Sequence, residues 1–176
     1  KAVQFTKLPT EHLTALAMPM SEERSTLRVN LISGILDIVH YNLARGNDSL
    51  ALYEVGQVFA KLGNETDNRP TELPQVAFAL TGKTYDFYTI KGIVETLLLQ
   101  FDNVRFEADQ SIAELHPGRT ARVLIGDVEV GFLGQVHPTL AKAYDISETY
   151  VANLDLSALL ANLPAQVIFT DIPKFQ

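Results

Sequence analysis

The chain has 176 residues, of which 47% are hydrophobic and 20% are charged, so it can bury the core of one domain and lacks the composition of a disordered chain. Its 14 basic and 21 acidic residues leave a net charge of −7, which excludes the broad basic surface of a stand-alone nucleic-acid-binding protein. It has no cysteine, and this excludes disulfides, thiolate metal sites and cysteine nucleophiles.

The first part of the chain is predicted to hold one long helix. Residues 1–18 alternate loosely in polarity around Pro9, which favours an edge segment or a connection. Pro19 and Ser21 mark the approach to a helix over residues 27–46, whose last residue is a glycine. One face of this helix is apolar and contains Leu27, Leu31, Ile35, Ile38 and Val39.

A hairpin and a second helix are predicted next. Residues 50–60 and 75–81 have the character of strands, and a polar loop over residues 61–74 separates them, so we expect the two strands to pair. Residues 86–101 have the clearest helical pattern in the chain, because their apolar side chains recur at helical spacing. These side chains are Phe87, Ile90, Val94, Leu97, Leu98 and Phe101.

The rest of the chain is predicted to alternate short strands with short helices. Gly126-Asp127 is typical of a tight hairpin, Pro138 of a first helical residue and Asp155 of a helix cap. Because hairpins dominate and helices arrive singly, the fold class is α+β, with an antiparallel sheet flanked by helices. The predicted segments are strands over residues 104–108, 119–125, 128–136 and 149–154, helices over 138–144 and 156–163, and a last apolar run at 167–170.

Three common patterns of binding or catalysis are incomplete in this sequence. Gly82-Lys83-Thr84 stands between a strand and a helix as a phosphate-binding loop would, but Ala77 replaces the glycine that such a loop needs. No G-x-S-x-G motif is present for a serine nucleophile. No two histidines have the spacing of helical metal ligands; the four are His12, His40, His116 and His137. We therefore predict no catalytic, cofactor-binding or metal-binding residue in this chain.

The segment His116-Pro117-Gly118-Arg119 is more distinctive. Pro117-Gly118 predicts a tight turn into a strand, with Arg119 at the start of that strand. His116 and His137 each precede a proline, so each is expected to cap a turn. Two interpretations stay open here, namely a purely structural turn and a turn that presents His116 and Arg119 to a partner.

Seven short phrases occur in a fixed order, and together they point to one family. They are PMSEERSTLR (19–28), YNLAR (41–45), LYEVGQVF (52–59), DFYTIKG (86–92), LHPGRTA (115–121), GFLGQVHP (131–138) and VANLDLSALL (151–160). In this order they resemble the catalytic-like core of the beta subunit of bacterial-type phenylalanine–tRNA ligase, over almost the whole chain. The resemblance implies the antiparallel α+β core of class II aminoacyl-tRNA synthetases.

The resemblance also implies a division of the chain and a place in a complex. Residues 1–18 would lead in from a preceding domain, residues 19–171 would form the core domain, and residues 172–176 would begin a linker to the next, so we expect an excised fragment. In this family the alpha subunit carries the active site, and the beta core packs against it in a heterotetramer. The holoenzyme would be a cytoplasmic ligase that uses ATP and Mg²⁺ to attach phenylalanine to tRNA.

Two further partner classes are disfavoured by the sequence. No apolar run approaches the roughly 20 residues that span a bilayer, so no membrane partner is expected. Direct tRNA contact would be sensitive to salt, and the acidity of the chain argues for weak contact or none.

The residues that class II chemistry requires are replaced in this chain. A working site needs an arginine after the first strand of the second motif, because a guanidinium grips phosphate oxygens through two hydrogen bonds. At that place the chain has Ala60-Lys61. The third motif needs glycines and a final arginine, and Leu154 and Ser157 stand roughly there. The resemblance therefore implies a non-catalytic scaffold, with ATP and Mg²⁺ bound only elsewhere in the holoenzyme.

Two sets of candidate residues follow from these interpretations. For the scaffold, the apolar faces of the two longer helices are candidate interfaces, although both faces would equally serve only to cover the sheet. Their candidate residues are Leu31, Ile35, Ile38, Phe87 and Val94. The alternative function is a residual small-molecule site, for a nucleotide or an amino acid, in the ancestral cleft. Its candidate polar residues are Glu54, His116 and Arg119, and His137 is a further candidate for either the interface or the cleft.

Overall fold

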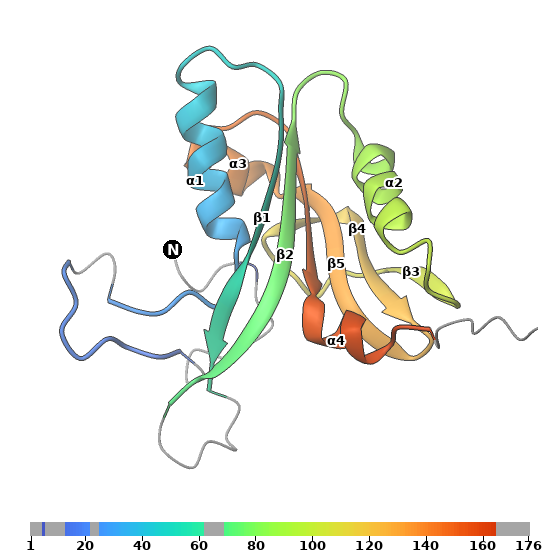
Figure 1. Ribbon diagram of the computed structural model, residues 1–176. Coiled ribbons are helices and arrows are strands. Elements are labelled where there is room, and N and C mark those ends of the chain that lie inside the picture. Colours follow the sequence, from blue (N-terminus) through green and yellow to red (C-terminus); the bar gives the residue numbers. More distant parts are fainter. Residues whose placement is uncertain (1–4, 6–12, 22–24, 62–68, 165–176) are drawn as a thin grey trace, which may run out of the picture.

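The computed structural model describes residues 5, 13–21, 25–61 and 69–164. Over these residues the chain forms a six-stranded antiparallel sheet in the order β1-β2-β6-β5-β4-β3 (Figure 1). This arrangement confirms the predicted fold class. The strands are β1 (Leu50–Ala60), β2 (Thr71–Thr81), β3 (Val104–Ala108), β4 (Leu115–Ile125), β5 (Val128–Val136) and β6 (Thr149–Asp155).

Helices cover both faces of the sheet, as Figure 1 shows. Helices α1 (Ile32–Leu43) and α3 (Pro138–Tyr144) pack on one face, which we call the α1 face. Helices α2 (Phe87–Leu97) and α4 (Leu156–Ala161) pack on the other, which we call the α2 face. Because successive strand residues point to opposite faces, each strand contributes alternate side chains to the two cores.

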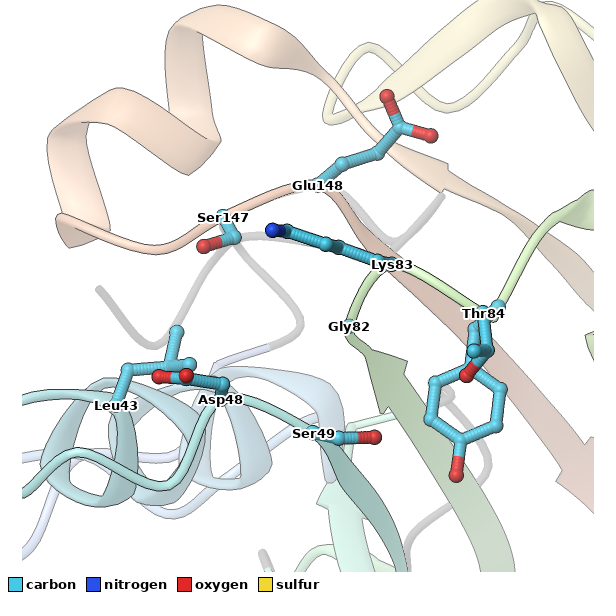
Figure 2. A pocket seen from close by; sticks show the side chains of 9 residues that line it. Leu43, Asp48, Ser49, Gly82, Lys83, Thr84, Ser147 and Glu148 are labelled. Atoms are coloured by element: carbon cyan, nitrogen blue, oxygen red, sulfur yellow. The ribbon is translucent and has the colours of Figure 1, made fainter.

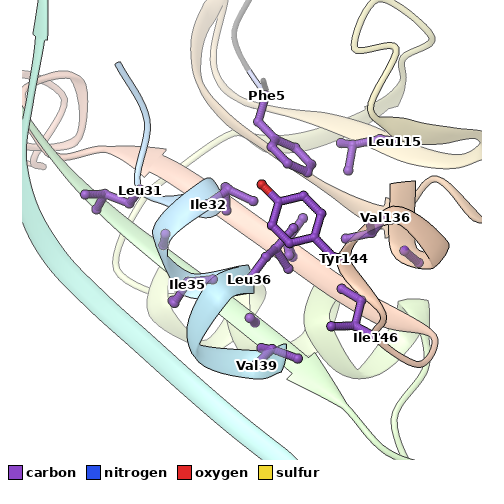
Figure 3. Packing of buried hydrophobic residues seen from close by; sticks show 14 of the residues in the cluster. Phe5, Leu31, Ile32, Ile35, Leu36, Val39, Leu115, Val136, Tyr144 and Ile146 are labelled. Carbon is purple, nitrogen blue, oxygen red and sulfur yellow. The ribbon is translucent and has the colours of Figure 1, made fainter. Parts of the chain in front are cut away.

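The core on the α1 face is built from a helix lying over small strand residues (Figure 3). Leu36 and Val39 of α1 are fully buried there. Ala77 and Ala79 of β2 are also fully buried, and their small side chains allow the helix to approach the strand closely. Tyr144 of α3 adds an aromatic ring to the same cluster. This packing fixes the position of α1 above the sheet.

Helix α2 begins at a capping box on the other side of the molecule. The Thr89 backbone N–H donates to the Asp86 carboxylate at 2.8 Å, and the Asp86 N–H donates to Thr89 Oγ1 at 3.3 Å. The hydrogen bonds from Thr89 lower the pKa of the Asp86 carboxyl, because they stabilise its charged form.

Replacing Asp86 by alanine is expected to lower the melting temperature at pH 7. The pKa of Asp86 is lowered on folding, so its carboxylate stabilises the protein above the unfolded-state pKa, and this contribution is lost as pH falls through the folded-state pKa. The difference between the wild type and Asp86→Ala should therefore shrink as the pH falls from neutrality to strong acid, as measured by thermal unfolding. In the variant Asp86→Asn, the asparagine side chain can still cap the helix, but it does not titrate. A difference that is the same at every pH would contradict this account.

The first predicted helix begins later than the sequence indicated. Residues before α1 are extended: Thr26 forms an antiparallel bridge with Ala15, and the Phe59 N–H donates to the Arg28 carbonyl at 2.8 Å. The helix begins only after Asn30, whose side-chain oxygen accepts the Ser33 N–H at 2.9 Å. The prediction that the helix begins at residue 27 was wrong. The hydrogen bond between Asn30 and Ser33 at the helix start outweighs the apolar spacing of the residues before it. Residues 22–24 lie outside the described residues.

Several other boundaries differ from the prediction. Strand β2 begins at Thr71, so its first residues replace the end of the predicted loop. Pro74 is tolerated there because β6 pairs with β2 only from Gln75 onward. Helix α2 ends at Leu97, before the predicted residue 101, and α4 ends at Ala161. The predicted apolar run at 167–170 lies outside the described residues.

The predicted turn at Pro117-Gly118 is instead an irregularity inside a strand. Residues 115–125 form the continuous strand β4, and its pairing with β5 shifts register between Leu115 and Thr120. Side-chain hydrogen bonds stabilise this bulge, since the Gly118 N–H donates to His116 Nδ1 at 3.1 Å and Thr120 Oγ1 donates to the His116 carbonyl at 2.7 Å. The turn prediction was wrong because such a bulge uses the same residue types as a turn.

The other local signals are confirmed. The β1–β2 and β4–β5 hairpins form, and Gly126 in the second has a φ of +58°. Gly46, just after α1, has a φ of +83°, as a helix-terminating glycine should. His137 caps α3, because its Nδ1 accepts the Thr139 N–H at 3.3 Å, and the Asp155 carboxylate caps α4.

Candidate functional site

The apolar residues predicted as an interface are mostly buried within the chain itself. Leu31 and Ile35 are 1% exposed and Val94 is fully buried, so their side chains belong to the two cores. Phe87 is half-buried and packs against the core on the α2 face. Ile38 differs, since 47% of it is exposed. The prediction of Leu31, Ile35 and Val94 as interface residues is therefore corrected: these side chains cover the sheet.

The residues predicted to line a common cleft are not brought together. Glu54 lies opposite Ala77, so its side chain is on the α1 face, where it accepts a hydrogen bond from Arg28 at 2.7 Å. Arg119 binds the side chain of Gln135, whose pairing with Tyr150 places it on the α2 face. With four strand spacings between β1 and β4, the backbones are also roughly 19 Å apart. No single cleft can therefore contain both Glu54 and Arg119.

Arg119 takes part in a polar cluster that links three strands. Its guanidinium donates to Gln135 Oε1 at 2.9 Å and lies 3.8 Å from the Glu148 carboxylate. The Tyr150 hydroxyl donates to the same carboxylate. Burial, reinforced by Glu148, raises the pKa of Tyr150 to about 12. The phenol therefore remains protonated at neutral pH and acts as a donor that joins the strand ends.

The two histidines of the predicted cleft have local structural contacts. His116 accepts a backbone N–H within the β4 bulge, and His137 accepts one at the start of α3. The expected cap at His137 is thus present, whereas His116 stabilises a bulge within β4 instead of capping a turn. Among the described residues no group of three or more potential metal-binding side chains is found, so neither histidine is part of such a cluster.

The Gly82-Lys83-Thr84 segment lines an open cavity of about 590 Å³ at one end of the sheet (Figure 2). Lys83 extends towards Ser147 across this cavity. Two carboxylates, Asp48 and Glu148, line the same space, which makes it a poor site for an anion. Gly82 has a φ of +134°, and a Cβ there would lie 2.9 Å from Ser49 Oγ. The glycine is therefore required by its positive φ and by the close approach of Ser49, just before β1.

A second cavity, of about 250 Å³, lies on the α1 face between β2, β5 and β6. We call it the acceptor cavity, because its polar lining consists of amide and carboxylate side chains: Asn30, Gln75, Glu129, Asn153 and Asp155. The amide oxygens of Gln75 and Asn153 are buried and have no hydrogen-bond partner within the described part of the chain. Asn153 is only 6% exposed. Sequence reasoning missed this site, although an asparagine within an apolar strand was an available signal.

Replacing Asn153 by leucine is expected to stabilise the protein by about 1 kcal/mol. A buried polar group without a partner costs roughly 1–3 kcal/mol, and leucine removes that group while the adjacent cavity accepts its extra volume. Urea unfolding of the wild type and the variant measures the difference, and Gln57→Leu, at an exposed position on β1, is the matched control. A loss of stability in Asn153→Leu would show that the amide is well satisfied in the folded state.

The acceptor cavity does not fit ATP. Among the described residues that line it, none is lysine or arginine, so nothing there would balance the charge of a triphosphate. The residues that stand at the second and third class II motifs are equally unsuited to binding ATP. Ala60 is 1% exposed, Leu154 is fully buried on the α2 face, and Ser157 is an exposed residue in the first turn of α4.

A third hollow is an apolar groove of about 600 Å³ on the α2 face. It lies between β1, the end of α2 and α4, and its exposed side chains include Tyr53 (74%), Val55 (60%) and Leu160 (66%). Strand β1 is the edge of the sheet. The Phe59 N–H points away from β2 and donates to Arg28. Because backbone N–H groups alternate in direction along a strand, the N–H groups of Tyr53 and Val55 also point away from β2. Within the described residues, no strand pairs with this edge at Tyr53 and Val55, although Arg28 binds it at Gln57 and Phe59, so the groove lies beside an edge that a docking protein could use.

Solved structures identify the class of fold. Two structures of pyrrolysyl-tRNA synthetase from Desulfitobacterium hafniense are similar to this chain, with TM-scores of 0.68 and 0.67 at 14% and 13% sequence identity. Each alignment covers 85% of this chain and 52% of the synthetase chain. The fold is thus that of a class II aminoacyl-tRNA synthetase core.

Sequence comparison identifies the family. A model of the phenylalanyl-tRNA synthetase beta chain CLM domain matches residues 1–156, and the chain belongs to this family. Phenylalanine–tRNA ligase beta subunits from Lactococcus lactis and Streptococcus pneumoniae strain R6 are 52% and 51% identical to it, over 93% and 99% of this chain. The chain spans 22–23% of the length of these relatives. Within the described residues, no helix is long and apolar enough to cross a membrane.

Proposed function

We propose that this chain is a non-catalytic scaffold module of a cytoplasmic phenylalanine–tRNA ligase. It docks on the alpha subunit, which carries the active site of the heterotetramer. The holoenzyme uses ATP and Mg²⁺ to attach phenylalanine to tRNA, and this module makes weak contact with the tRNA or none. The beta-subunit relatives support the assignment to this complex.

The apolar groove is the observation that carries the docking proposal. Its exposed side chains lie next to the outward N–H groups of β1, so one partner segment can pair with the strand edge and insert alternate side chains into the groove. Arg28 and Glu54 form an ion pair near this edge, which leaves little net charge to repel an approaching strand. We assign the alpha subunit as the occupant, because it is the other polypeptide of the proposed enzyme.

The chemistry of the sheet surface supports the non-catalytic part of the proposal. The places where class II chemistry needs phosphate-binding arginines hold Ala60-Lys61, Leu154 and Ser157. An arginine is not replaceable here, since only its planar guanidinium gives two parallel hydrogen bonds to phosphate. The alpha subunit must therefore supply the groups that bind ATP.

Two titrations of the 176-residue chain test this function. With the purified alpha subunit, calorimetry should give saturable binding. With ATP and Mg²⁺, the same chain should give no binding heat. Failure to bind the alpha subunit would overturn the scaffold proposal, whereas saturable ATP binding would overturn the loss of the nucleotide site. An unrelated acidic protein of similar size, titrated in place of the chain, is the control for non-specific association.

A further inference from the structure

We infer that the acceptor cavity is a binding site for a small organic ligand that carries a primary ammonium group. The inference concerns the α1 face and does not depend on docking at the apolar groove, which lies on the opposite face of the sheet. The chemical class follows from three properties of the cavity: its unpartnered acceptors, its charge and its apolar border.

The acceptors come from neighbouring strands and face one space. Gln75 lies opposite Asp155 in the β2–β6 pairing, and Asn153 lies two residues before Asp155 on the same face. The terminal amide torsions of asparagine and glutamine are broad, so either oxygen can turn towards a donor in the cavity at low energy. An ammonium group has three donors and no acceptor, and thus matches a site rich in oxygen acceptors.

The charge of the lining selects a cation. Asp155 and Glu129 contribute carboxylates, of which Glu129 also interacts with Arg122 outside the cavity, and the described lining contains no lysine or arginine. One oxygen of Asp155 already accepts the Ala158 N–H at 3.0 Å, which fixes the carboxylate at the cavity. Opposite charge at short range favours the protonated amine, whereas a phosphate or carboxylate would be repelled.

The border of the cavity is apolar and suits a short hydrocarbon chain. Phe5, Leu73 and Phe132 contribute side chains to the lining, beside the polar groups. Asn30 lies between α1 and the sheet, where it already accepts hydrogen bonds from Ser33. A volume of about 250 Å³ accommodates a small amine but not a nucleotide triphosphate.

Nuclear magnetic resonance of the ¹⁵N-labelled chain tests the inference with n-butylammonium as the probe. The side-chain NH₂ signals of Gln75 and Asn153 should shift in a saturable way. Butan-1-ol, of the same length, and tetramethylammonium, with the same charge but no N–H donor, should shift them weakly and without saturation. Equal shifts with butan-1-ol would show an unselective apolar cavity, and the absence of saturable shifts with butylammonium would show a cavity filled only by water. Either result would overturn the inference.

Variants separate this site from the docking function. Asn153→Leu and Gln75→Leu should each weaken butylammonium binding about tenfold, followed through the signals of the remaining lining residues. Gln57→Leu, outside the cavity, should bind as the wild type does. Both cavity variants should still bind the alpha subunit, because the cavity and the groove are on opposite faces. Unchanged butylammonium affinity in both cavity variants would contradict the assignment of the acceptors.

Discussion

Replacing Gly131 by alanine is expected to destabilise the chain by about 3 kcal/mol, and this is the largest stability effect that we predict. A Cβ at this position of β5 would overlap the backbone oxygen of Asn153 and lie 2.9 Å from Leu154 Cα. Both contacts are with the neighbouring strand β6, so relief requires the two strands to separate. The β4–β5 register shift beside Gly131 shows that the sheet is already irregular there.

Urea unfolding followed by circular dichroism measures this effect, and Gly34→Ala is the matched control. Gly34 lies within α1, and a Cβ there would meet nothing within 4 Å. Alanine should therefore stabilise the protein by roughly 0.5–1 kcal/mol at that position, because it lowers the entropy of the unfolded chain. If Gly131→Ala is as stable as the wild type, the close approach of β5 to β6 is wrong.

The double variant Val55→Asp with Leu160→Asp is expected to weaken binding to the alpha subunit about 100-fold. Both side chains line the apolar groove, and burying two unpaired carboxylates in an apolar interface is strongly unfavourable. Their exposure in the free chain, 60% and 66%, means that folding stability should change little. Calorimetric titration gives the affinity, and thermal unfolding checks the fold.

Val128→Asp is the matched control for the groove variant. Val128 is an exposed valine at the start of β5 and is not among the residues that line the groove. Its replacement should leave the affinity for the alpha subunit unchanged. If both variants bind as the wild type does, the groove is not the docking surface.

The elements of the fold were predictable where local signals agree. The span of β1, the cap of α4 and the proline start of α3 all follow from nearby residues, and the structure confirms them. The start of α1 failed because Leu27 and Leu31 fit a helical stripe as well as an extended segment. The side chain of Asn30, which decides between the two, carries no periodic signal.

The candidate site was much less predictable, because it depends on strand register. Glu54 and Arg119 both looked suited to a cleft, yet the pairing of β1 with β2 and of β5 with β6 places them on opposite faces. Register was not available from the sequence, and a shift of one residue reverses every side chain of a strand. The groove was missed for the same reason, since Tyr53 and Leu160 are far apart in sequence and meet only through packing.

Hydrogen exchange at the edge of β1 tests the central claim most directly. The outward N–H groups of Tyr53 and Val55 have no partner strand in the described chain, so peptides from residues 50–57 should exchange rapidly at those amides. In the complex with the alpha subunit, the account predicts that the same amides become strongly protected. Equal exchange of this segment in the free chain and in the complex would contradict the proposal that the alpha subunit docks along β1.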